Sequence, residues 1–207
     1  MISQWQSVFS HNLNFELYIS LEKMSLTYSE MMPLGTVAPA FSLPDAVSGK
    51  TLSLDDLKSD IGTVIMFICN HCPYVIHVEN EIAAIANEYQ KKGIAFIAIS
   101  ANDAENYPQD SPDNMKVKAA EVGYSFPYLH DESQEVAKAY QAACTPDFYV
   151  FDAKLQCVYR GRMDNSSPGN GQPVTGSALR NTLDAVIDGT SISNEQLPSM
   201  GCNIKWK

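Results

Sequence analysis

The sequence reads Phe67-Ile-Cys69-Asn-His71-Cys72-Pro-Tyr-Val75 at the point where a strand pattern changes into a helix pattern. The run Thr63 to Ile68 is apolar and rich in β-branched residues, which predicts a strand buried on both faces of a parallel or mixed sheet. Beyond the junction, apolar residues recur at steps of three and four until Gly93, which predicts one long amphipathic helix. Two cysteines therefore stand where a buried strand meets the start of a helix.

This placement gives the cysteines a chemical role. A thiol at the N-terminus of a helix lies at the positive end of the helix dipole, near unpaired backbone N–H groups, and this lowers its pKa from about 8.5 toward neutrality. The thiolate is the reactive form of cysteine. We therefore predict that Cys72 and Cys69 are catalytic and that His71 could tune the thiols. The alternative interpretation is that both cysteines are small buried hydrophobic residues.

Outward from the junction, strand and helix patterns alternate. This order predicts an α/β fold in which helices flank a central mixed sheet. The predicted elements are a strand Ile94 to Ile99, a helix from Ser111-Pro112 to Gly123, a strand Phe126 to Leu129, a helix around Val136 to Tyr140, a hairpin of Phe148 to Phe151 with Leu155 to Tyr159, and a last helix from Leu179 to Gly189.

The chain is expected to contain one domain with a segment at each end. A Pro-punctuated entry begins near Gly35, and the last helix ends at Gly189, so we place the domain at residues 33–189. Residues 1–32 form an N-terminal extension for which poor order is an option, and Met24 is an alternative start of the native chain. Residues 190–207 form a C-terminal tail without periodicity.

Composition excludes several functions. The chain has 14 Lys and Arg against 24 Asp and Glu, a net charge of −10, so it offers no basic surface for nucleic acid or an anionic membrane. No apolar run reaches the roughly 18 residues that a membrane span needs. Five cysteines are too few and too unevenly spaced for a disulfide scaffold. We therefore expect a cytoplasmic protein whose cysteines serve catalysis or metal binding.

The junction resembles the thioredoxin-like superfamily, and the flanking sequence resembles its redoxin branch, the AhpC/TSA (peroxiredoxin-like) relatives. The resemblance covers roughly Pro33 to Gly189, and it implies a thioredoxin-like fold and a redox-active cysteine. It rests on Ala38-Pro-Ala-Phe41, Glu88-Tyr-Gln-Lys-Lys-Gly93 and Thr145-Pro146-Asp-Phe148. A narrower peroxiredoxin-like subgroup of thioredoxin-family proteins is indicated by Cys69-Asn-His-Cys72-Pro-Tyr-Val, Ser100-Ala-Asn-Asp103, Cys144-Thr-Pro-Asp and Gly201-Cys-Asn-Ile-Lys-Trp206.

The resemblance also implies which cysteine is the nucleophile. In the superfamily, the first cysteine of the CxxC motif stands at a set number of residues after the strand aromatic and before the helix tyrosine. Counted from Phe67 and from Tyr89, that cysteine corresponds to Cys72 rather than to Cys69. Cys72-Pro-Tyr-Val75 then resembles the glutaredoxin CPYC motif with Val75 at the second cysteine. The peroxiredoxin motif PxxxTxxC does not fit, because Ile65 and Cys69 stand where Pro and Thr would be.

A second segment is implicated by the same resemblance. Thr145-Pro146 resembles the cis-proline turn that faces the nucleophile and pairs with the substrate backbone. Cys144 would then lie near Cys72, so Cys144 and Cys202 are candidate resolving cysteines in addition to Cys69.

The resulting hypothesis is a thiol–disulfide oxidoreductase in which Cys72 attacks a substrate disulfide or oxidant. Its expected partners are a thiol or disulfide protein or a small-molecule oxidant, together with an external thiol reductant. We expect no cofactor, no nucleic acid and no membrane. One alternative is a peroxiredoxin-like thiol peroxidase with an antioxidant role. Another is a protein that binds zinc or Cu(I) through Cys69, Cys72 and Cys144, joined by His71 or Cys202.

Overall fold

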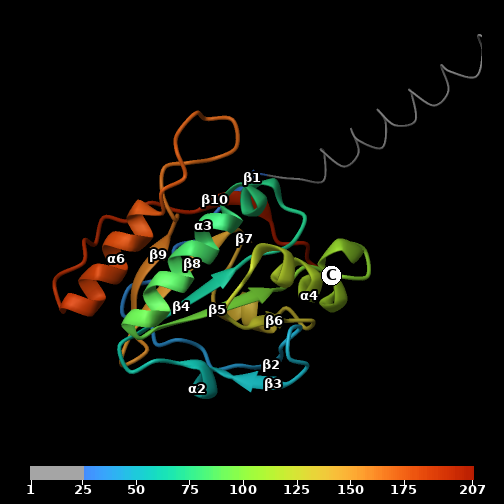
Figure 1. Cartoon of the computed structure of the whole chain (residues 1–207), viewed down its shortest axis with the longest axis horizontal. Coiled ribbons are helices and arrows are strands. Elements are labelled where there is room, and N and C mark those ends of the chain that lie inside the picture. Colours follow the sequence, from blue (N-terminus) through green and yellow to red (C-terminus); the bar gives the residue numbers. More distant parts are fainter. Residues whose placement is uncertain (1–25) are drawn as a thin grey trace, which may run out of the picture.

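A five-stranded mixed sheet forms the centre of the protein, whose computed structural model describes residues 26–207. The strand order is β6-β5-β4-β8-β9 (Figure 1). Strands β4, β5 and β6 are parallel, whereas β8 runs antiparallel to β4 and β9 runs antiparallel to β8. The bounds are β4 Gly62–Phe67, β5 Ile94–Ser100, β6 Tyr128–His130, β8 Asp147–Asp152 and β9 Cys157–Gly161.

Strand β4 is buried along its whole length because both faces of the sheet are covered. Val64 and Met66 point into one hydrophobic core, and Ile65 and Phe67 point into the other. The continuous apolar run therefore reflects two cores that share one strand, as predicted from the sequence.

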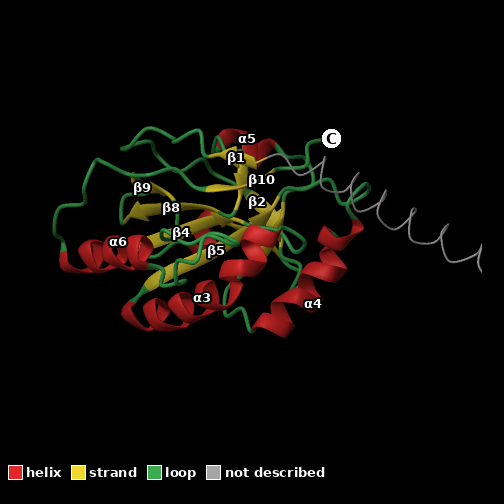
Figure 2. Cartoon of the chain, turned by 90° about the horizontal axis from the view of Figure 1, so that it is seen from above, coloured by secondary structure: helices red, strands yellow, loops and turns green. Residues whose placement is uncertain are grey.

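Helices cover the two faces unequally. Three long helices lie on one face and pack on the core that contains Val64 and Met66 (Figure 2). They are α3 Pro73–Tyr89, α4 Pro112–Val122 and α6 Ser177–Asp188. The short α5 Glu135–Ala139 covers the opposite face. The core on this opposite face, which contains Ile65 and Phe67, also receives residues from the N-terminal segment. That segment holds β2 Ser42–Pro44, β3 Thr51–Ser53 and α2 Leu54–Leu57.

Helix α3 starts at the cysteines. Cys72 is its N-cap residue and Pro73 occupies the first turn, where the missing proline N–H costs no helical hydrogen bond. The helix ends at Tyr89 and passes through a short 3₁₀ turn to Gly93, which has a φ of 89°. Its buried stripe consists of Val75, Val78, Ile82, Ala83, Ile85, Ala86 and Tyr89. The predicted strand-to-helix junction is confirmed.

A second, three-stranded sheet joins both ends of the described chain. It has the order β1-β10-β7, with antiparallel pairs, and consists of β1 Leu26–Tyr28, β10 Met200–Asn203 and β7 Cys144–Thr145. The register places Cys202 opposite Thr145. Gly201 is required there, because a Cβ atom at this position would overlap the Thr145 carbonyl oxygen. The tail thus contains a strand that its sequence pattern does not indicate.

The predicted end segments contact the predicted domain. Met32 of the extension is fully buried, and Ile204 of the tail is 1% exposed. The expectation of poor order falls mostly on residues 1–25, which lie outside the described residues. Within residues 26–207, no helix has the length and apolar character needed to cross a membrane.

Candidate active site

Three segments meet at the Cys72 thiol. Cys72 is fully buried at the start of α3, and its Sγ lies 3.2 Å from the backbone oxygen of Thr145 in β7. The thiols of Cys202 and Cys69 both hydrogen bond to Cys72. Cys202 comes from β10, whose register places it opposite Thr145. The site therefore joins the loop after β4, strand β7 and the C-terminal tail.

The hydrogen bonds select Cys72 as the thiolate of this group. Donation by the Cys202 and Cys69 thiols, together with the Val75 N–H, lowers the pKa of Cys72 to about 2 against the opposing effect of burial. The hydrogen bond to Cys72 raises the pKa of Cys202, and burial adds to the rise. Burial is the main cause that raises the pKa of Cys69. One nucleophile and two protonated thiols result.

The loop that carries Cys69 is fixed by polar contacts. Cys69 Sγ lies 3.4 Å from the Thr145 hydroxyl. The Asn70 backbone N–H donates to the Asp110 carboxylate at 2.7 Å, and the Tyr128 hydroxyl donates to the Asn70 side-chain oxygen at 3.1 Å. These bonds hold Asn70, the residue that follows Cys69, in the loop between β4 and α3.

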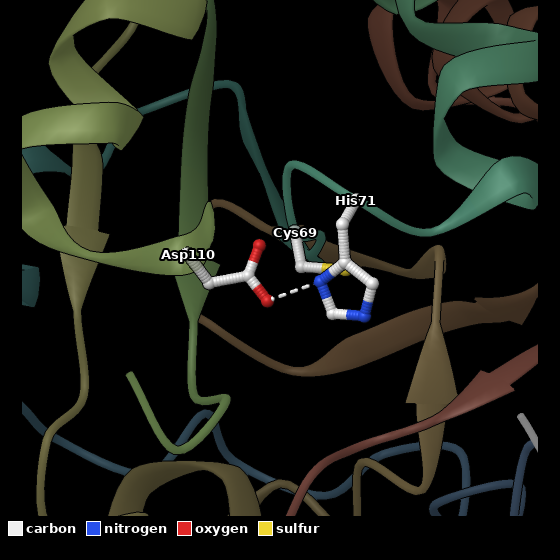
Figure 3. Close-up of side chains that lie close together, drawn as sticks. All are labelled: Cys69, His71 and Asp110. Atoms are coloured by element: carbon white, nitrogen blue, oxygen red, sulfur yellow. Dashed lines mark hydrogen bonds and ion pairs between the residues drawn. The ribbon is translucent and has the colours of Figure 1, made fainter. Parts of the chain in front are cut away.

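His71 faces Asp110 (Figure 3). Its Nδ1 lies 2.7 Å from an Asp110 carboxylate oxygen, and its ring stacks on Tyr107 with centroids 5.6 Å apart. Asp110 is fully buried and also accepts a bond from the Asn102 amide at 2.7 Å. Sequence reasoning missed Asp110, because an aspartate just before the Ser111-Pro112 helix start is typical of an ordinary loop.

Cys69, His71 and Asp110 form a group of potential metal ligands. Their donor atoms lie within 4.8 Å of one another. However, two ligands at about 2.0 Å from one tetrahedral zinc would stand about 3.3 Å apart, farther than the 2.7 Å between His71 Nδ1 and Asp110. The contact is a hydrogen bond, so this arrangement fits a proton better than a metal ion.

The predicted turn contains a cis peptide bond between Thr145 and Pro146. Cys144 immediately before it is fully buried, and its Sγ lies 3.9 Å from the Pro146 carbonyl oxygen. Burial and the nearby Asp147 raise the pKa of Cys144. Cys144 interacts electrostatically with Cys72 and Cys202, so it lies near the site, and no hydrogen bond joins it to either thiol among the described residues.

A cleft with a volume of about 430 Å³ is lined by sequence neighbours of the site residues, among them Tyr74, Pro146 and Met200, but by none of the cysteines. His77 lies in its wall, and the His77 Nε2 atom is buried without a hydrogen-bond partner among the described residues. Burial is the largest cause that raises the pKa of Tyr74, which also lies in this wall. The cleft wall includes Tyr28, Tyr74, His77, Pro146, Arg162 and Met200.

The mixed sheet, with a cysteine at the first turn of the helix after β4, defines a thioredoxin-like protein. The thioredoxin domain of a thiol-disulfide oxidoreductase from Bacteroides vulgatus shares this fold, with a TM-score of 0.57 and 19% identity over 76% of this chain and 99% of that one. The AhpC/TSA family model matches residues 34–160, and the chain belongs to the AhpC/TSA family.

Two solved structures are much more similar in sequence. An uncharacterized conserved protein from Geobacillus kaustophilus is 58% identical, with a TM-score of 0.88, over 89% of this chain and 97% of that one. A hypothetical protein from Sinorhizobium meliloti is 44% identical, with a TM-score of 0.85, over 87% of this chain and 98% of that one. No curated protein matches the chain.

Proposed function

We propose that this protein is a thiol–disulfide oxidoreductase whose nucleophile is the Cys72 thiolate. The observation that carries the proposal is the position of Cys72 at the N-terminus of α3, where the Cys202 and Cys69 thiols donate hydrogen bonds that lower its pKa. A cysteine held as the thiolate at neutral pH attacks disulfides, whereas a buried thiol in an apolar core is inert.

Cys202 is proposed as the resolving cysteine. Cys72 attacks one sulfur of a substrate disulfide, forms a mixed disulfide and releases the other sulfur as a thiolate, which takes up a proton. Cys202 loses its proton and attacks the Cys72 sulfur, which releases the second substrate thiol and forms a Cys72–Cys202 disulfide. Two electrons pass from the cysteine pair to the substrate, and an external thiol restores the pair.

Cys69 has a different proposed role. It also hydrogen bonds to Cys72, but its loop is fixed through Asn70 to Asp110 and Tyr128. We assign Cys69 the role of a donor that stabilises the Cys72 thiolate, and we assign Cys202 the role of forming the disulfide with Cys72.

A thiol peroxidase is the second candidate, and the burial of Cys72 favours it. A hydroperoxide is small enough to reach a fully buried sulfur by a minor opening. The Cys72 thiolate would take one oxygen and release an alcohol, and Cys202 would condense with the resulting sulfenic acid and release water. This route yields the same Cys72–Cys202 disulfide.

Substitution of the nucleophile tests the proposal. We expect Cys72→Ser to lower reduction of a small aromatic disulfide by more than about 100-fold, because a serine hydroxyl is not ionised at neutral pH. Cys157→Ser is the matched control, since Cys157 is also buried but lies on β9 outside the site. Unchanged activity in Cys72→Ser would overturn the proposal.

A further inference from the structure

The backbone edge beside the nucleophile is already occupied. Thr145 pairs with Cys202 of the protein's own β10, and Gly201 lies against the Thr145 carbonyl oxygen. A protein partner that docks by adding a strand at Thr145 would have to displace β10. A reaction partner must therefore reach the cysteines by another route while β10 is paired.

The cleft described above provides such a route. Its volume of about 430 Å³ is in the range that binds small molecules. Met200 lines the cleft, and Cys202 lies two residues farther along β10, on the same face of that strand. Pro146 in the cleft wall follows Thr145, whose carbonyl oxygen contacts Cys72. The cleft wall thus contains neighbours of Cys202 and of Thr145, and the buried cysteines themselves do not line it.

The polar groups of the cleft favour an anionic ligand. Arg162 lines the cleft and forms no ion pair within residues 26–207. The buried Nε2 atom of His77 also has no hydrogen-bond partner in that part of the chain. The acidic residue of the wall, Asp164, is already bound by the backbone N–H groups of Thr175 and Gly176 at 2.7 Å each. In a chain with a net charge of −10, this local excess of donors is complementary to a carboxylate.

We propose that this cleft binds a low-molecular-weight thiol that carries a carboxylate, and that this thiol is the external reductant of the Cys72–Cys202 disulfide. The inference rests on the proposed function. The carboxylate contacts Arg162 and His77, which directs the thiol of the ligand toward β10.

The reaction then has a defined direction. The ligand thiolate attacks the Cys202 sulfur, because Cys72 has the lower pKa and is the better leaving group. Cys72 leaves as the thiolate, and a mixed disulfide remains at Cys202. A second ligand thiol attacks the ligand sulfur of that mixed disulfide, which releases the ligand disulfide and restores the Cys202 thiol. Two electrons pass from two ligand thiols to the cysteine pair.

The test measures how fast each of two small thiols reduces the Cys72–Cys202 disulfide in the oxidised full chain. The probes are 3-mercaptopropionate, which carries a carboxylate, and neutral 2-mercaptoethanol. Each rate is divided by the rate of the same thiol with a free aromatic disulfide, which removes differences in intrinsic reactivity. The variants are Arg162→Gln and the control Arg160→Gln, whose residue lies on β9 two positions before Arg162, outside the cleft, and bonds Gln196 at 2.8 Å.

We expect the normalised rate with mercaptopropionate to exceed that with mercaptoethanol by about tenfold. Arg162→Gln should reduce the normalised mercaptopropionate rate to that of mercaptoethanol, and Arg160→Gln should keep the preference. Equal normalised rates for the two thiols in the unmodified protein would overturn the inference about the cleft but not the proposed function. A preference for mercaptopropionate that survives Arg162→Gln would do the same. Failure of the protein to form any disulfide of Cys72 would instead overturn the proposed function.

Discussion

At the scale of single residues, the reactivity of Cys72 depends on its neighbours more than on its helix. The sequence places Cys72 at a helix N-terminus, and that position alone lowers a thiol pKa. The structure adds hydrogen bonds from Cys202 and Cys69, of which the bond from Cys202 is the largest single cause. A residue at the far end of the chain therefore helps to determine the ionisation of the nucleophile.

Two substitutions of Cys202 separate its donor role from its redox role. Cys202→Ala removes the hydrogen bond, so we expect the pKa of Cys72 to rise, and with it the pH at which the thiolate forms. Cys202→Ser retains a donor and should keep the pKa of Cys72 close to its unmodified value. The measurement is the ultraviolet absorbance of the thiolate against pH. An identical titration of Cys202→Ala and the unmodified protein would contradict this assignment.

At the scale of elements, β10 is the strand that completes the site. It lies between β1 and β7 and carries Cys202 to the first turn of α3. Its position depends on Gly201, since any side chain there would overlap the Thr145 carbonyl oxygen.

Gly201→Ala tests the importance of this close approach. We expect the methyl group to push β10 away from β7, so that the amide of Cys202 loses protection from hydrogen exchange and the Cys72–Cys202 disulfide forms more slowly. Met200→Ala on the same strand is the control, because it adds no atom next to Thr145. Retained protection and disulfide formation in Gly201→Ala would show that β10 does not depend on this contact.

Elements differed in how well the sequence predicted them. Strand β4 and helix α3 have long apolar patterns, because each buries a continuous face, and both were predicted. The hairpin of β8 and β9 was predicted from its two apolar runs and turn. Strand β10 was not, because its four residues Met200–Asn203 include a glycine and show no alternation. Its position is fixed by pairing with β1 and β7, and a local sequence pattern cannot predict pairing with strands that are distant in the sequence.

At the scale of the whole molecule, one buried carboxyl group couples folding to pH. Asp147 at the start of β8 is fully buried, and burial raises its pKa to about 6, although the Ser29 and Tyr149 hydroxyls bond to it and partly oppose the rise. The folded state therefore binds this proton more tightly than the unfolded state. The resulting stabilisation is complete below about pH 4 and is lost as the pH rises through about 6.

We expect the free energy of unfolding to fall by about 3 kcal/mol from this group over that interval. Asp147→Asn should remove this contribution, so the difference in stability between the variant and the unmodified protein should depend on pH between about 4 and 6. Urea unfolding at several pH values measures it. A difference that stays constant with pH would show that Asp147 does not titrate in this range.

The site could be predicted only in part, because it is assembled from distant segments. Cys69 and Cys72 were identified from their place between a strand and a helix, and the Thr145-Pro146 turn from the family resemblance. The convergence of Cys202 on Cys72 depends on the path of the tail, which long-range pairing fixes. Asp110 gave no signal, since its importance comes from burial against a loop some forty residues earlier.

The most direct test of the central claim is a disulfide map. The protein is purified without oxygen, treated with a stoichiometric amount of a thiol oxidant, alkylated, and analysed by peptide mass spectrometry. We expect a Cys72–Cys202 disulfide, with Cys144 and Cys157 still alkylated as free thiols. A Cys69–Cys72 disulfide would transfer the resolving role to Cys69. A Cys72 that remains a free thiol while other cysteines oxidise would contradict its assignment as the nucleophile.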